Sequence, residues 1–67
     1  MNVKPIFLDI AGVAATLSLS EASIRTLINQ GNFPKSRLIS GRRVAWLVRE
    51  LEEWAEARPV SNLPPVA

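Results

Sequence analysis

Apolar residues recur every three or four positions in two short stretches near the start of the chain. The first stretch contains Ile10, Val13, Ala14 and Leu17, and the second contains Ile24, Leu27 and Ile28. This spacing places each set on one face of an amphipathic helix. Asp9 and Ser20 stand shortly before these stretches, where a side-chain oxygen can accept from the free N–H groups of a first helical turn. The pattern predicts a helix over residues 10–17 and a second helix opened by Ser20, joined by a tight turn in which Leu19 points back to the core.

The period changes after the second helix. Gly31 can end that helix in a left-handed backbone conformation, and Pro34 prevents its continuation. Residues 37–46 then show two β-favouring runs around a short Gly-containing connection, which is typical of a hairpin. Helical spacing returns afterwards at Leu47, Leu51, Trp54 and Ala55. These residues predict a third helix that Pro59 stops.

The order of these elements predicts a mainly α protein with a small β-hairpin. A helix-turn-helix is followed by a hairpin and a third helix, which is the layout of a winged helix-turn-helix. We expect the folded domain to cover residues 6–58, and residues 59–67, which contain three prolines, to form an extended tail. A chain of 67 residues makes one domain at most. Its core must be economical, because so short a chain buries only about 60% of the surface that its unfolded form exposes.

The composition argues against an enzyme. The chain contains neither Cys nor His, which excludes disulfides, Cys/His zinc sites, a Cys nucleophile and an imidazole base. The glutamates of the third helix, at positions 50, 52, 53 and 56, are expected to form a solvated face and not a pair of catalytic carboxylates. We expect no catalytic residue, no metal and no cofactor. The absence of a secretory signal pattern and of any run of about 20 apolar residues predicts a cytoplasmic protein without a membrane span.

The charges are unevenly distributed along the chain. The formal net charge is only +2, but residues 20–46 contain five basic side chains and one acidic one. Residues 47–67 contain two basic and four acidic side chains. This asymmetry separates a candidate phosphate-facing side from a solvated back, and it makes double-stranded DNA the expected partner.

The helix opened by Ser20 has the composition of a recognition helix. The major groove is about 12 Å wide and admits one α-helix, whose side chains near the N-terminus reach base edges. The outward residues that we expect to contact bases are Glu21, Ser23, Arg25, Thr26 and Asn29. Arg25 can form two hydrogen bonds to guanine and Asn29 two to adenine, whereas Glu21 can accept from a cytosine amino group or be repelled by phosphate.

Other polar residues are candidates for contact with the DNA backbone or the minor groove. They are the helix-capping serine and the cations of the hairpin, namely Ser20, Lys35, Arg37, Arg42 and Arg43. If about four phosphates are neutralised, the logarithm of the binding constant falls with the logarithm of salt concentration at a slope of about −3 to −4. Such contacts position the protein without reading sequence. The small footprint of one helix and one wing predicts cooperative binding of several copies on neighbouring sites.

Each candidate also has a purely structural interpretation. Arg25 can be a solvated side chain on an exposed helix face, and the two adjacent arginines of the hairpin can keep an edge strand from pairing with other molecules. Trp46 and Trp54 could stack on bases, but a domain this small needs large aromatics in its core. We interpret residues 33–34 as a structural latch between the second helix and the hairpin.

Several of these motifs together resemble a known family. Gly-Asn-Phe-Pro-Lys at residues 31–35, Val-Ala-Trp at residues 44–46 and Glu-Trp at residues 53–54 occur in an order and spacing that are hard to obtain by chance. Over residues 8–58 the chain resembles the AlpA-like regulators of prophages and integrative elements. These are small winged-helix proteins related to excisionases and to the DNA-binding domain of MerR regulators.

The chain departs from this family at three positions. Typical members carry a basic residue directly after the cap of the second helix and often an aromatic residue four positions later, where this chain has Glu21 and Arg25. They commonly carry Gly where Ser18 stands. The fold tolerates these changes, but the DNA sequence preferred by a relative is not carried over.

The resemblance implies a sequence-specific DNA-binding regulator of a phage or integrative element. Such a protein acts on transcription, on excision as a recombination directionality factor, or on both, and the residues do not separate these roles. The alternative is a protein-interaction module. In that case the acidic third helix and the Pro-containing tail recruit an integrase or RNA polymerase, and DNA contact is secondary.

Overall fold

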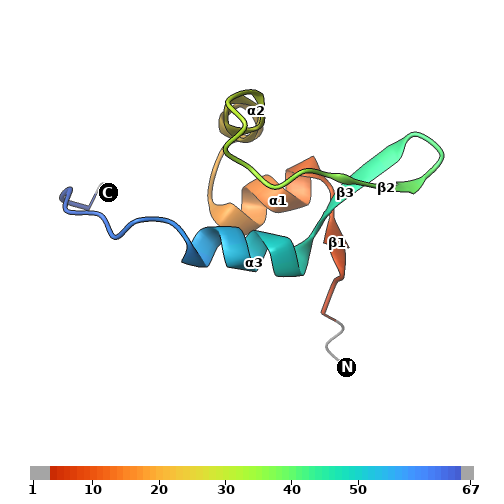
Figure 1. Cartoon of the computed structure of the whole chain (residues 1–67). Helices are drawn as coiled ribbons and strands as arrows, with labels where there is room; N and C mark the ends of the chain where they lie inside the picture. Colours follow the sequence, from red (N-terminus) through yellow and green to blue (C-terminus); the bar gives the residue numbers. More distant parts are fainter. Residues whose placement is uncertain (1–3, 66–67) are drawn as a thin grey trace.

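The computed structural model describes residues 4–65, and within them the winged helix-turn-helix layout is confirmed (Figure 1). The elements in chain order are β1 (Phe7–Leu8), α1 (Ile10–Leu17), α2 (Glu21–Asn29), β2 (Arg37–Ser40), β3 (Arg43–Leu47) and α3 (Val48–Glu56). The third helix is shorter than the spacing predicts at both ends. Leu47 belongs to β3, and the last turn closes with the Ala57 N–H donating to the Glu53 carbonyl.

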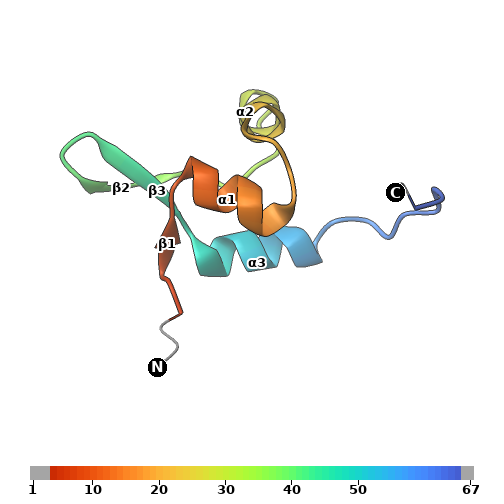
Figure 2. The same ribbon diagram turned by 180° about the vertical axis from the view of Figure 1, so that it is seen from behind.

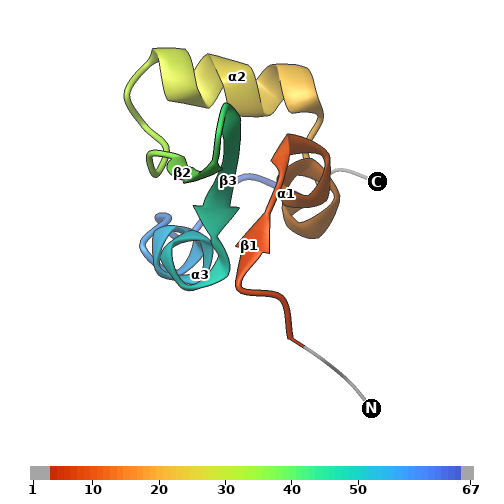
Figure 3. The ribbon, with the colours of Figure 1, turned by 90° about the vertical axis from the view of Figure 1, so that its right-hand side faces the viewer.

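The short strand β1 was not predicted from the sequence. It pairs antiparallel with β3, Phe7 opposite Leu47 and Leu8 opposite Trp46, so that the hairpin belongs to a three-stranded sheet with the order β1-β3-β2. Two residues are too few to show the alternating pattern of a strand. The pairing also joins Phe7 to Leu47, far along the chain, which short-range sequence patterns do not reveal. Figure 3 shows β1 beside β3, between α1 and α3.

Both predicted N-terminal caps of the first two helices are confirmed. The Asp9 carboxylate accepts from the Gly12 N–H at 2.8 Å, and the Ser20 hydroxyl accepts from the Ser23 N–H at 3.0 Å. These bonds satisfy N–H groups that have no partner within the helix. The sequence therefore fixes where α1 and α2 begin.

The core is built from α1, α2, β3 and α3. Its buried side chains are Val13, Ala14, Ile24, Ala45, Trp46 and Leu51. The prediction that Leu19 points to the core is wrong, since 37% of Leu19 is exposed. The chain leaves the helical period here: Ser18 adopts a left-handed conformation with φ 59°, and the Leu19 N–H donates to the Ala14 carbonyl at 3.0 Å, which is a Schellman closure.

Two tryptophans hold the loop between α2 and the hairpin. The Trp46 indole N–H donates to the Pro34 carbonyl, and the Trp54 indole N–H donates to the Asn32 carbonyl, both at 2.9 Å. Between them Phe33 packs edge-on against both indoles, with ring centroids 6.4 Å from Trp46 and 5.0 Å from Trp54. The interpretation of residues 33–34 as a latch is thus confirmed, and we call residues 32–34 with the two tryptophans the aromatic latch.

Replacing Trp46 by Phe is expected to weaken the latch. The variant keeps an aromatic ring but leaves the partly buried Pro34 carbonyl without its donor and removes packed atoms, so the free energy of unfolding should fall by about 2 kcal/mol. Urea denaturation measures this change. Trp54→Phe is the matched control at a more exposed site and should cost less. A larger loss for Trp54→Phe would contradict the dominant role of Trp46.

Ser18→Gly is expected to stabilise the protein. A left-handed conformation costs a non-glycine residue about 1–2 kcal/mol, and glycine removes this cost. Because glycine also has more conformational freedom in the unfolded chain, the free energy of unfolding should rise by only about 0.5–1 kcal/mol. Thermal or urea denaturation measures the effect. Gly31→Ala is the opposite control, because Gly31 has φ 73° and open space around it, so only backbone strain is added. A destabilised Ser18→Gly variant would show that the hydroxyl has a role of its own.

Candidate nucleic-acid interface

The helix α2 and the tip of the hairpin lie on the same side of the molecule. Figures 1 and 2 show both at the upper side and α3 at the lower side, in views from opposite directions. The hairpin projects away from the helices, and its turn is made by Gly41, with φ 53°, and Arg42. The helix that carries the residues predicted to contact bases and the hairpin that carries the basic turn therefore lie on one side of the backbone.

On α2 the two charged candidates pair with each other. Arg25 lies 3.6 Å from the Glu21 carboxylate, one helical turn away, with 59% and 45% of the two side chains exposed. An exposed pair of this kind contributes little to stability and exchanges readily with water. Asn29 is exposed at the last position of α2. Arg25 and Asn29 are therefore accessible to a ligand.

The hydroxyl candidates on α2 are engaged within the helix. The Ser23 hydroxyl accepts from the Ser20 hydroxyl at 2.9 Å, and the Thr26 hydroxyl donates to the Ala22 carbonyl at 3.0 Å. Ser20 acts as the cap of the helix, which uses one of its two acceptor lone pairs. Thr26 has thus spent its only proton, and what it offers to a ligand is an acceptor lone pair and a methyl group.

Sequence reasoning missed the apolar part of this surface. A shallow hollow of about 430 Å³ is lined by Leu19, Ala22, Ser23, Thr26 and Leu27. The exposed methyl of Ala22 could have been found from the sequence, because positions four residues apart share one helix face and Ala22 therefore accompanies Thr26. The exposure of Leu19 depends on the Schellman closure of α1 and could not.

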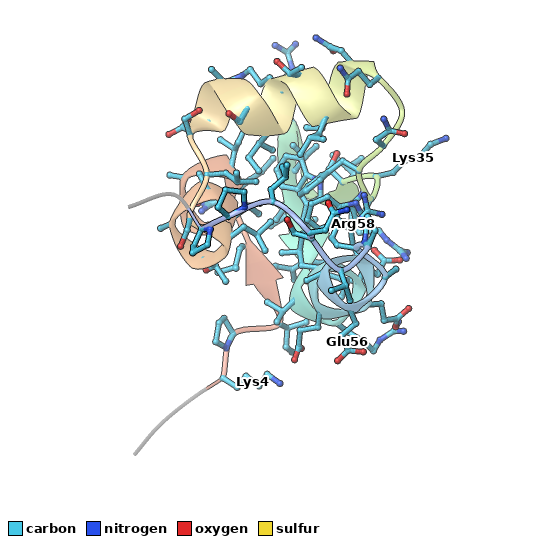
Figure 4. All side chains as sticks on the ribbon, turned by 90° about the vertical axis from the view of Figure 1, so that its left-hand side faces the viewer. Lys4, Lys35, Glu56 and Arg58 are labelled. Atoms are coloured by element: carbon cyan, nitrogen blue, oxygen red, sulfur yellow. The ribbon has the colours of Figure 1, made fainter. Side chains whose placement is uncertain are left out.

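The hairpin β2–β3, which we call the wing, and the loop before it carry cations of two kinds. Among the described residues Lys35, Arg42 and Arg43 are exposed and make no ion pair. Arg37, by contrast, donates to the Glu50 carboxylate of α3 at 2.7 Å. In Figure 4 Lys35 extends from the loop after α2, on the far side of the molecule from Glu56 of α3.

The ion pair between Arg37 and Glu50 shifts both pKa values. The hydrogen bond from the guanidinium lowers the pKa of the Glu50 carboxyl, and the same bond raises the pKa of Arg37. The pair engages one of the five N–H donors of Arg37, so the predicted backbone contact of Arg37 would have to use the others or compete with Glu50. The pair also ties β2 to the first turn of α3.

The acidic face of α3 is largely matched by cations. Glu50 binds Arg37, Glu52 lies 3.4 Å from Lys4, and Glu53 lies 3.0 Å from Arg49. The Arg58 guanidinium lies 4.5 Å from the centre of the Trp54 ring. Within residues 4–65 no cluster of potential metal ligands occurs, and no helix there is long and apolar enough to cross a bilayer.

Comparison with known proteins adds independent information. The sequence model of the family described as prophage CP4-57 regulatory protein (AlpA) matches residues 7–59. An uncharacterized protein of Enterobacteria phage P4, ORF88, is 36% identical over 52 residues. The matched segment covers 78% of this chain and 59% of the phage protein. The chain therefore spans little more than half the length of that relative.

Glu50→Gln is expected to reduce stability in a pH-dependent manner. Since the folded-state pKa of Glu50 is lowered, the stabilisation is present above the unfolded-state value of about 4.3 and is lost as the pH falls through the folded-state pKa. Urea denaturation of both proteins should show a small deficit for the variant near neutral pH that vanishes in acid. Glu56→Gln, which has no cationic partner among the described residues, is the control. A Glu50→Gln deficit that persists in acid would contradict a charge-based contribution.

Proposed function

The chain belongs to the AlpA family of prophage regulatory proteins, and we propose that it acts by binding double-stranded DNA in a sequence-specific manner. The observation that carries this proposal is the shared side of α2 and the hairpin tip (Figure 1). A recognition helix in the major groove and a cationic loop on the adjacent backbone or minor groove require this arrangement.

The outward residues of α2 supply the base contacts. Arg25 leaves Glu21 and binds guanine, because a bidentate contact is worth about 1–3 kcal/mol in discrimination, whereas an exposed ion pair is worth about 0–1 kcal/mol. Glu21 is then released to accept from a cytosine amino group, and Asn29 binds adenine. Ser23 retains a proton for donation, while Thr26 does not.

The wing supplies the backbone contacts. Lys35, Arg42 and Arg43 bind phosphates or enter the minor groove, since they have no acidic partner to displace among the described residues. Arg37 adds a fourth contact if DNA competes successfully with Glu50. The net effect is to fix the register of α2 in the groove.

We further propose that DNA binding controls transcription, excision, or both. Binding beside a promoter would regulate transcription, and bending or bridging an attachment site would let an integrase assemble for excision. Cooperative binding of several copies would enlarge the small footprint of one domain. An integrase or RNA polymerase is the expected protein partner in these roles.

The alternative of a protein-interaction module has weaker support. It requires α3 to present an acidic surface, but three of its four glutamates are paired with Arg37, Lys4 and Arg49. These pairs are largely exposed and weak, but they reduce the net negative charge that α3 offers to a partner. Lys35, Arg42 and Arg43, which make no ion pair among the described residues, instead lie in the loop after α2 and in the hairpin.

The proposal predicts a strong dependence of binding on salt. Duplexes selected from a random pool should bind with a log–log slope of about −3 to −4, and replacing both Arg42 and Arg43 by Ala should reduce the magnitude of this slope by about 2 and weaken binding. Fluorescence anisotropy across a salt series measures both quantities. Arg49→Ala, on α3, is the matched control and should leave the slope unchanged. The proposal fails if no duplex binds at low salt or if Arg49→Ala has the same effect as the wing variant.

A further inference from the structure

We infer that the apolar hollow on α2 recognises the 5-methyl group of thymine in the major groove. The inference rests on the proposed DNA-binding function and specifies which base this part of the helix reads. The hollow is lined by Leu19, Ala22, Ser23, Thr26 and Leu27, and its lining is mostly apolar. It extends from Leu19, before α2, to Leu27, and so includes the N-terminal turn of the helix, the part of a recognition helix that approaches base edges.

The hydrogen bonds around the hollow leave it poor in donors. Of the two hydroxyls that line the hollow, that of Thr26 donates its proton to the Ala22 carbonyl, and that of Ser23, which accepts from Ser20, is the one donor that remains. The groups that remain at this surface are chiefly carbon: the methyls of Ala22 and Thr26 and the side chain of Leu19, which is 37% exposed. An apolar surface of this kind recognises shape and loses affinity when it faces a polar group.

Only one base offers an apolar group in the major groove. Guanine and adenine present acceptors or donors there and cytosine presents an amino group, whereas thymine presents its 5-methyl beside one carbonyl. Contact of Ala or a Thr methyl with the thymine methyl is a known mode of direct readout. The chemistry of the hollow therefore selects thymine over cytosine at the same position.

The charges around the hollow favour DNA as its occupant. Its one acidic neighbour on α2, Glu21, is paired with Arg25 at 3.6 Å in the free protein and, in the proposed complex, accepts from a cytosine amino group. Lys35, Arg42 and Arg43, which are unpaired among the described residues, attract a polyanion to the same side of the molecule. An apolar protein segment would gain nothing from these cations.

The test replaces thymine by uracil, which removes only the methyl group. The wild-type protein first selects its preferred duplex from a random pool, and each thymine of that duplex is then replaced singly. Binding should weaken about three- to fivefold at one or two positions, the loss expected for one methyl group, and stay unchanged elsewhere.

Two variants of Thr26 separate the methyl from the hydroxyl. Thr26→Ser keeps the bond to the Ala22 carbonyl and removes the methyl, so it should reduce the preference for thymine over uracil at one of these positions. Thr26→Val keeps the methyl and should retain the preference. Equal binding of thymine and uracil duplexes at every position, or loss of the preference in Thr26→Val but not in Thr26→Ser, would overturn the inference while the proposed function stands. Failure to bind any duplex would overturn both.

Discussion

Two indole N–H groups hold the segment between α2 and the wing, and the relative placement of these two elements depends on them. Trp46 lies on β3 and Trp54 on α3, so the carbonyls of Pro34 and Asn32 are fixed to the sheet and to the third helix at once. Phe33 fills the space between the rings. Among residues 4–65 only six hydrophobic residues are buried, so this cluster supplies much of the packing that a larger core would provide.

Features that depend on neighbouring residues could be predicted from the sequence. The caps at Asp9 and Ser20, the left-handed glycine at position 31 and the hairpin all follow from short-range rules. The strand β1 could not be predicted, because only its pairing with β3 makes two residues a strand. Leu19 was misplaced for a related reason: its direction is set by how α1 ends and not by the apolar period.

In the candidate interface, too, the sequence predicts what depends on neighbouring residues and not what depends on contacts in the folded chain. The sequence identifies which side chains carry donors and charges, but not which of them are already used. Arg37 is bound to Glu50, thirteen positions away, and Thr26 has given its proton to its own helix. The Ala22 side chain has no polar atom, so a search for hydrogen-bonding groups passes over it, although it lines the hollow.

The aromatic latch also affects how the protein would meet a duplex. The two indole hydrogen bonds hold the loop after α2 against β3 and α3, so the positions of α2 and the hairpin are fixed in the free protein. Little conformational entropy therefore remains to be lost when the protein binds a duplex. The separation between α2 and the hairpin is therefore set in the free protein. Duplexes whose groove geometry already fits this separation need the least deformation, so stiffness and groove width at base pairs that no side chain touches would contribute to the choice of site.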